Sequence, residues 1–173
     1  MRKHSICIVI WAALAIYLPA LALAADSFLG TWHFNLEKSR IDLIPPPPVN
    51  TYRFTHFSAT TTFQAQGDYI KMIVDVTDPT DPIAHSEGKS HHAEGIVRFD
   101  GNEYPANGGF PGTTIALIKI NDHTLESVLR NTGHEIARER LVISRDGDTM
   151  TSTSKYNNGM GQDVVRIMVF DKE

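Results

Sequence analysis

The stretch Phe28-Leu29-Gly30-Thr31-Trp32-His33-Phe34-Asn35 contains a Gly-x-Trp motif that continues into alternating apolar and polar residues. This alternation predicts a β-strand with one buried face. Trp32 is large enough to plug one end of a closed β-barrel, and Gly30 allows the backbone to pass closely beneath the ring. We therefore expect this stretch to begin a barrel, with Gly30 and Trp32 as structural residues where it closes.

After residue 50 the chain consists of short runs rich in Thr, Val, Ile, Tyr and Phe, separated by turns that contain Gly, Asn or Asp. These turns are mostly too short for the crossovers of a two-sheet Greek-key sandwich, which is the competing architecture. We predict an all-β, closed, up-and-down antiparallel barrel of about 8–10 strands. Besides the first strand, the expected strands are residues 51–58, 60–66, 69–77, 90–99, 113–120, 124–131, 135–144, 149–156 and 163–170.

Helical structure has little support. Residues 36–40 are compatible with a single helical turn, and no helix of ten or more residues fits anywhere in the chain. Residues 45–48 are consecutive prolines, which end regular structure. They predict a stiff polyproline spacer or barrel lid, the alternative being a ligand for a proline-reading domain.

Residues 1–24 are predicted to be an export signal. Arg2 and Lys3 give a positive start, a long apolar run follows, and small residues around Ala24 suit cleavage. An uncleaved membrane anchor is the alternative, because the run approaches the length of a membrane span. Cleavage would leave one domain, residues 25–173, in the periplasm or secreted, with no stable membrane insertion.

Charge and cysteine content narrow the function classes. The single cysteine, Cys7, lies in the predicted signal, so residues 25–173 have no disulfide, thiol nucleophile or thiolate ligand. Two of the 16 basic residues and none of the 20 acidic ones precede Ala25, which leaves a net charge of −6 (14 minus 20). This acidic balance disfavours nucleic acid and anionic membranes as partners. Common catalytic and phosphate-binding motifs are absent, and we expect no cofactor.

Four motifs in order, Gly30-Thr31-Trp32 and residues 100–105, 144–151 and 169–172, together resemble those of bacterial exported lipocalin-like proteins. They resemble more loosely the calycin superfamily, which includes lipocalins and fatty-acid-binding proteins. The resemblance spans nearly all of residues 25–173. It implies a barrel that carries hydrophobic ligands.

The last strand departs from one branch of that superfamily. Fatty-acid-binding proteins end in Arg-x-Tyr-Glu-Lys, whose Arg and Tyr hold a ligand carboxylate, whereas this chain ends in Met168-Val169-Phe170-Asp171-Lys172. Arg166 lies upstream on the same strand face and offers a displaced anion contact. The resemblance instead implies a structural role, in which Arg166 stacks on Trp32 at the barrel closure.

The ligand hypothesis is that the lumen binds a small hydrophobic or amphipathic molecule. Arg140 would hold an anionic head group if it points inward, and would pair with acidic residues outside if it does not. The apolar residues that would line such a lumen also suit a solid barrel that acts through its loops. The sequence leaves both the hollow and the solid barrel open. The predicted ligand-binding residues are Tyr52, Phe54, Met72, Phe99, Arg140 and Met168.

Two weaker patterns remain. His85, His91 and His92 are residue types that bind zinc or copper, but adjacent strand residues point to opposite faces, so a solvated loop is the simpler interpretation and no metal site is predicted. His33 and Glu139 are the candidates for acid–base chemistry if the lumen is an active site, and we expect a binding protein rather than an enzyme.

Overall fold

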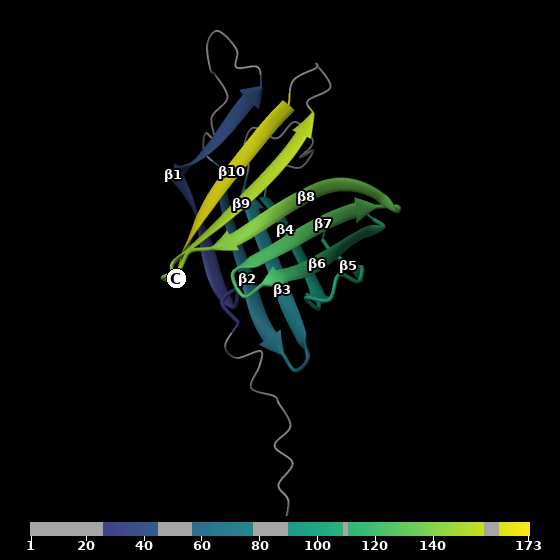
Figure 1. The fold of residues 1–173 in the computed structure, drawn as a ribbon. Coiled ribbons are helices and arrows are strands. Elements are labelled where there is room, and N and C mark those ends of the chain that lie inside the picture. Colours follow the sequence, from purple (N-terminus) through teal and green to yellow (C-terminus); the bar gives the residue numbers. More distant parts are fainter. Residues whose placement is uncertain (1–25, 45–56, 78–89, 109–110, 158–162) are drawn as a thin grey trace, which may run out of the picture.

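The computed structural model describes residues 26–44, 57–77, 90–108, 111–157 and 163–173, and these residues form one β-sheet without helices (Figure 1). No helix in this part of the chain meets the length and hydropathy needed to span a membrane. The strands are β1 (Gly30–Ile44), β2 (Ser58–Gln66), β3 (Tyr69–Thr77), β4 (Ser90–Val97), β5 (Tyr104–Pro105), β6 (Thr113–Asn121), β7 (Thr124–Asn131), β8 (His134–Ile143), β9 (Thr149–Asn157) and β10 (Asp163–Lys172).

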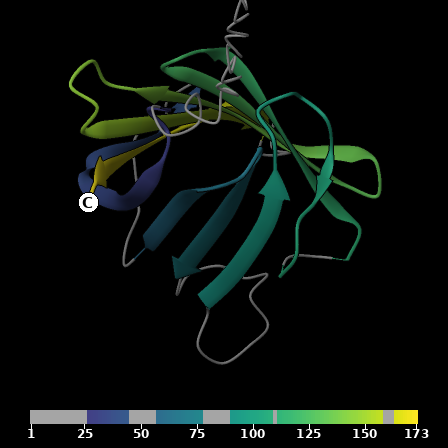
Figure 2. The ribbon, with the colours of Figure 1, turned by 90° about the horizontal axis from the view of Figure 1, so that it is seen from below.

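The strands follow one another around a nearly closed barrel. Their spatial order is β4-β3-β2-β1-β10-β9-β8-β7-β6-β5, and every paired neighbour is antiparallel. The first strand therefore pairs with the last, and all other neighbours are consecutive in sequence. Viewed from below, the strands curl around a common interior (Figure 2). The prediction of an all-β, up-and-down antiparallel barrel is confirmed.

The sheet has two edges, β4 and β5, which short bridges join. Glu94 of β4 and Asn107 exchange two backbone hydrogen bonds of 2.9 and 2.8 Å. Asp100, which follows β4, bridges to Ile118 of β6. We call the contact between β4 and residues 105–108 the seam, because it is where the barrel is completed without a continuous ladder.

Most predicted strand boundaries agree closely with the structure. The predicted strands 69–77 and 124–131 coincide with β3 and β7, and those from residue 90 onward otherwise differ from β4, β6, β8, β9 and β10 by at most two residues at either end. The predicted strand 60–66 lies within β2. Most of the predicted strand 51–58, residues 45–48 and the predicted signal lie outside the described residues. The two-residue strand β5 was not predicted.

The predicted helical turn at residues 36–40 is wrong, because β1 continues through it as a bulge. The pairing of β1 with β10 shifts register between Asn35 and Arg40. Within the bulge the Lys38 amide donates to Asn35 Oδ1 at 3.0 Å, and Ser39 Oγ donates to the Asn35 carbonyl at 2.6 Å. Ser39 Oγ also accepts from the Val169 amide at 2.9 Å, which fastens the bulge to β10. Side-chain hydrogen bonds thus replace the missing ladder bonds.

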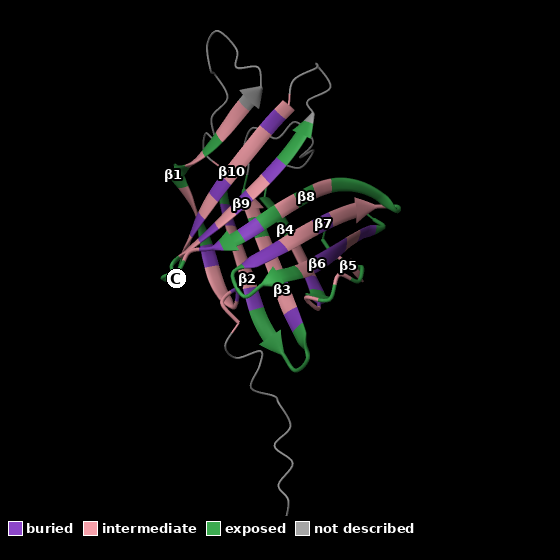
Figure 3. Cartoon of the chain, in the orientation of Figure 1, coloured by how far each residue is buried: buried purple, intermediate pink, exposed green. Residues whose placement is uncertain are grey.

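A packed core fills the end of the barrel that contains Trp32, and burial alternates along several strands (Figure 3). Trp32 and Phe28 are fully buried, and Trp32 Nε1 donates to the Phe28 carbonyl at 2.9 Å. Phe28, Phe63 and Phe99 form a cluster of edge-to-face rings with centroids 6.2 to 6.5 Å apart. This end is therefore closed by aromatic packing.

The predicted stacking of Arg166 on Trp32 is wrong, because the cation over this ring is Lys172, with Nζ 4.8 Å from the ring centroid. Lys172 is the register partner of Trp32, whereas Arg166 pairs with Ile41 in the other half of β10. Gly30 has a φ of +127°, and a Cβ there would lie 2.9 Å from Lys172 Cε. The close backbone approach at Gly30 thus accommodates Lys172.

Candidate functional site

A cavity of about 500 Å³ lies inside the barrel. It begins next to the packed core, at Phe63, Leu117 and Phe170, and extends toward the opposite end, at Val76 and Ile136. The interior thus has two parts, a filled one around Trp32 and a hollow one beyond it. Cavities of about 300–1,000 Å³ are typical of sites that hold small molecules.

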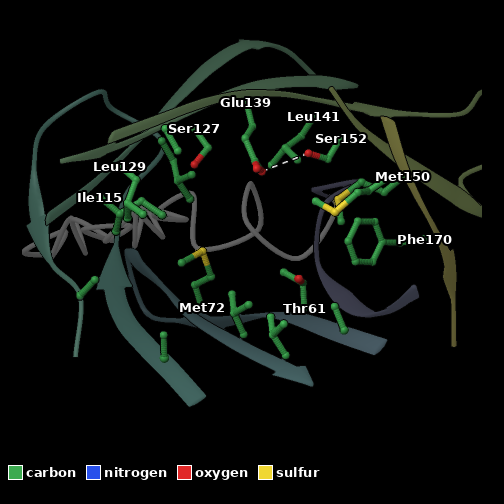
Figure 4. A pocket seen from close by; sticks show the side chains of 18 of the residues that line it. Thr61, Met72, Ile115, Ser127, Leu129, Glu139, Leu141, Met150, Ser152 and Phe170 are labelled. Carbon is green, nitrogen blue, oxygen red and sulfur yellow. Dashed lines mark hydrogen bonds between the residues drawn. The ribbon is translucent and has the colours of Figure 1, made fainter. Parts of the chain in front are cut away.

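One wall of the cavity is apolar. The inward-facing residues of β2, β3 and β4 that line it are all apolar except Thr61. Met72 and Thr61 lie on this side in Figure 4, across the cavity from Ser127, Glu139 and Ser152. A ligand surface against β2 to β4 would therefore contact mainly hydrocarbon and a thioether, which adapts to irregular shapes.

Four polar residues form a row on the opposite side of the barrel, which we call the polar row. Ser127, Glu139 and Arg166 of this row line the cavity, and Ser154 lies in register between Glu139 and Arg166 without lining it. Ser127 of β7 is the register partner of Glu139 of β8, which is opposite Ser154 of β9, and Ser154 is opposite Arg166 of β10. Residues paired in this way share one face of the sheet. The polar row therefore crosses adjacent strands on the inner face.

An ion pair holds the polar row together. Arg166 Nη2 donates to Glu139 Oε1 at 2.8 Å. Ser152 Oγ donates to Glu139 Oε2 at 3.0 Å, as the dashed line in Figure 4 shows. The side chains of Arg166 and Glu139 are 32% and 23% exposed, so both charges are largely withdrawn from solvent. The Glu139 carboxylate has a partner on each oxygen, and the pair as a whole carries no net charge.

Two atoms of the polar row have no hydrogen-bond partner. They are Arg166 Nε and Ser154 Oγ, and both are buried. Both carry a proton to donate, and leaving such groups unpaired costs free energy. Arg166 Nε can only donate, whereas the Ser154 hydroxyl can donate or accept, so it is the unused guanidinium N–H that requires an acceptor.

The structure brings only part of the predicted ligand site together. Met72 and Met168 both line the cavity, whereas Phe99 packs against the core with Phe28 and Phe63. Tyr52 and Phe54 lie outside the described residues.

The inward direction considered for Arg140 is wrong, and the cause is strand alternation. On β8 the residues that line the cavity include Ala137, Glu139 and Leu141, so Arg140 points to the outside and is exposed. Arg138, on the same outer face, pairs with Glu135 and Glu126.

The two acid–base candidates are separated by the barrel wall. His33 is exposed and faces Glu173 at 3.5 Å on the outer surface, so it does not reach the lumen. Glu139 lines the cavity.

The histidines considered for metal binding do not form a site among the described residues. His92 pairs with Asp75 at 2.7 Å, and His85 lies outside the described residues. No group of three or more His, Cys, Asp or Glu side chains suited to a metal occurs among the residues that the structure describes.

Sequence reasoning missed Ser127 and Ser154 of the polar row, and Ser152, which donates to Glu139. A usable signal was present on β9, where Met150, Ser152 and Ser154 alternate with Thr151 and Thr153. All three of the first set are buried, so two serines occupy core positions of a strand. Buried hydroxyls on an apolar face indicate a polar partner across the sheet.

No protein-family model matches this chain, and no curated protein matches its sequence. The resemblance to lipocalin-like proteins therefore remains a prediction from the four sequence motifs. The fold and the cavity are what argue for a function.

Proposed function

We propose that this protein is an exported binding protein that holds a small amphipathic molecule in its barrel. The observation that carries the proposal is the cavity of about 500 Å³, which has an apolar wall and a polar row on the facing wall. Hydrophobic lining with a few placed polar groups is the usual composition of a small-molecule site. Carriage of hydrophobic ligands is also what the resemblance to the calycin superfamily implies.

The alternative is a solid barrel that acts through its loops. A small barrel can be filled completely by its side chains, as the Trp32 end is here. The other half keeps small residues such as Ala93, Ala106 and Ala137 at lining positions. Larger apolar side chains there would bury more surface and stabilise the fold further, so the small residues favour a role for the space itself.

Export is the second part of the proposal. It is supported by the basic start, apolar run and small residues of residues 1–24. A disulfide-free exported protein depends on its core for stability, and the aromatic packing around Trp32 supplies one. The ligand would then be taken up outside the cytoplasm.

Native mass spectrometry of the chain, expressed at full length in an exporting host and purified gently, tests both parts. We expect a protein mass consistent with cleavage after Ala24, plus a bound mass that solvent extraction removes. An uncleaved protein mass in the exported fraction would contradict the prediction that residues 1–24 are a cleaved signal. Protein that is purified without a bound mass and also fails to bind the neutral dye Nile red would contradict the proposed binding function.

Two tryptophan substitutions on β8 localise the binding. Ala137→Trp places a large ring in the cavity, whereas Val142→Trp places the same ring on the outer face, where Val142 is 38% exposed. We expect Ala137→Trp to lower Nile red affinity at least about ten-fold because the ring fills the space. Val142→Trp should leave the affinity unchanged, and equal losses in both variants would place the dye elsewhere.

A further inference from the structure

The polar row lies partway along the cavity, with apolar residues on either side. On β8, Glu139 stands between Ala137 and Leu141, and all three line the cavity. On β10, Arg166 is followed toward the core by Met168 and Phe170, which also line it. A ligand that reaches the core therefore passes the polar row with its side rather than with its end.

The charge of the polar row opposes an anionic ligand. Arg166 already has its counter-charge in Glu139, at 2.8 Å. A ligand carboxylate that approached the guanidinium would bring a second negative charge close to Glu139, and like charges at such short range repel each other. An uncharged oxygen accepts from the same guanidinium without that repulsion. The pair thus discriminates between two kinds of acceptor by charge.

The two facing walls of the cavity differ in the groups that they present to a ligand. Ser127 presents a hydroxyl and Arg166 a guanidinium at the cavity surface. Arg166 Nε and Ser154 Oγ have no hydrogen-bond partner and are themselves buried. The opposite wall, from β2 to β4, is apolar except for Thr61. The two walls therefore suit different sides of one molecule.

We propose that the ligand is uncharged and two-sided, with hydroxyl or carbonyl oxygens along the side that faces the Glu139–Arg166 pair and hydrocarbon along the side that faces β2 to β4. This inference rests on the proposed function and specifies its ligand class. It excludes carboxylates such as free fatty acids as preferred ligands.

The charge preference is tested with two probes of the same chain length, 1-dodecanol and dodecanoate, which differ in the charge of the oxygen-bearing group, as competitors of Nile red at pH 8. We expect wild-type protein to bind dodecanol at least about ten-fold more tightly than dodecanoate. Equal or tighter binding of dodecanoate would overturn the inference and leave the carrier function standing. Bound Nile red that neither compound displaces would also overturn it, whereas protein that binds neither dye nor any cellular molecule removes the proposed function itself.

Two variants connect the preference to the ion pair. Glu139→Gln removes the counter-charge while keeping the side-chain shape, so Arg166 becomes available to an anion. We expect dodecanoate affinity to rise about ten-fold and dodecanol affinity to change by less than about three-fold. Arg140→Gln, at the exposed neighbouring position, should alter neither. An unchanged ratio in folded Glu139→Gln protein would refute the role of the pair, and the wild-type comparison decides the preference even if this variant does not fold.

Discussion

Replacing Gly108 with alanine should open the seam of the barrel. Gly108 has a φ of +88°, and a Cβ built there would overlap the His92 carbonyl oxygen of β4. It would also lie 3.0 Å from the His92 carbonyl carbon and 3.1 Å from Ala93 Cα. These are backbone atoms, which cannot rotate aside, so the clash is relieved only if residue 108 moves away from β4.

The expected loss of stability has two parts. Placing alanine at this positive φ costs about 1 kcal/mol. Movement away from β4 also breaks the two backbone hydrogen bonds between Glu94 and Asn107, each worth about 1 kcal/mol. Gly108→Ala should therefore lower the free energy of unfolding by about 3 kcal/mol.

Gly147→Ala is the matched control, because Gly147 has a φ of +84° but no atom within 4 Å of the added Cβ. It should cost only the conformational part, about 1 kcal/mol. Urea unfolding followed by tryptophan fluorescence measures both variants, since Trp32 is the one tryptophan outside the predicted signal. Equal losses in the two variants would refute the closure of the barrel at the seam.

Two further predictions concern stability. Trp32→Phe should lower the free energy of unfolding by about 2–4 kcal/mol, because it leaves space in the core and an unpaired Phe28 carbonyl. Since this variant lacks the reporting tryptophan, its urea unfolding is followed by far-UV circular dichroism. His33→Ala, exposed on the same strand, should cost little in the same assay, and a comparable loss would contradict the role of Trp32 in closing the barrel. For acid stability, the hydrogen bond from Lys38, followed by that from Asn35, holds the pKa of Asp171 below its usual value. Its carboxylate therefore stabilises the fold above the unfolded pKa of about 3.9, and this contribution is lost as pH falls through the lower folded pKa. Asp171→Asn should flatten the fall in stability below about pH 4 in urea titrations, and an unchanged slope would count against the pair.

Strand positions were predictable because turn chemistry is local. The limits of β3 and β7 follow from Gly67-Asp68, Asn121-Asp122 and residues 131–133, where glycine, asparagine or aspartate suits a tight turn. The continuation of β1 was not predictable in this way. The bulge after Asn35 depends on Ser39 bonding to Val169, a residue far away in sequence.

The candidate site was only partly predictable, because inward direction depends on strand parity. On β8, charged and apolar residues occur on both faces, so the pattern did not distinguish Arg140 from Glu139. A shift of one residue exchanges the two faces completely. Pairing with β7 and β9 placed Glu139 inside and Arg140 outside.

The sequence by itself determined the all-β class, the up-and-down order and most strand limits, because alternation and turn residues act over a few neighbouring positions. The ion pair between Glu139 and Arg166 was decided only by tertiary structure, since β9 lies between their strands and sets their register. The tertiary structure also decided the division of the interior into a filled end and a cavity. This division depends on how side chains from opposite walls meet, and that information is not local in the chain.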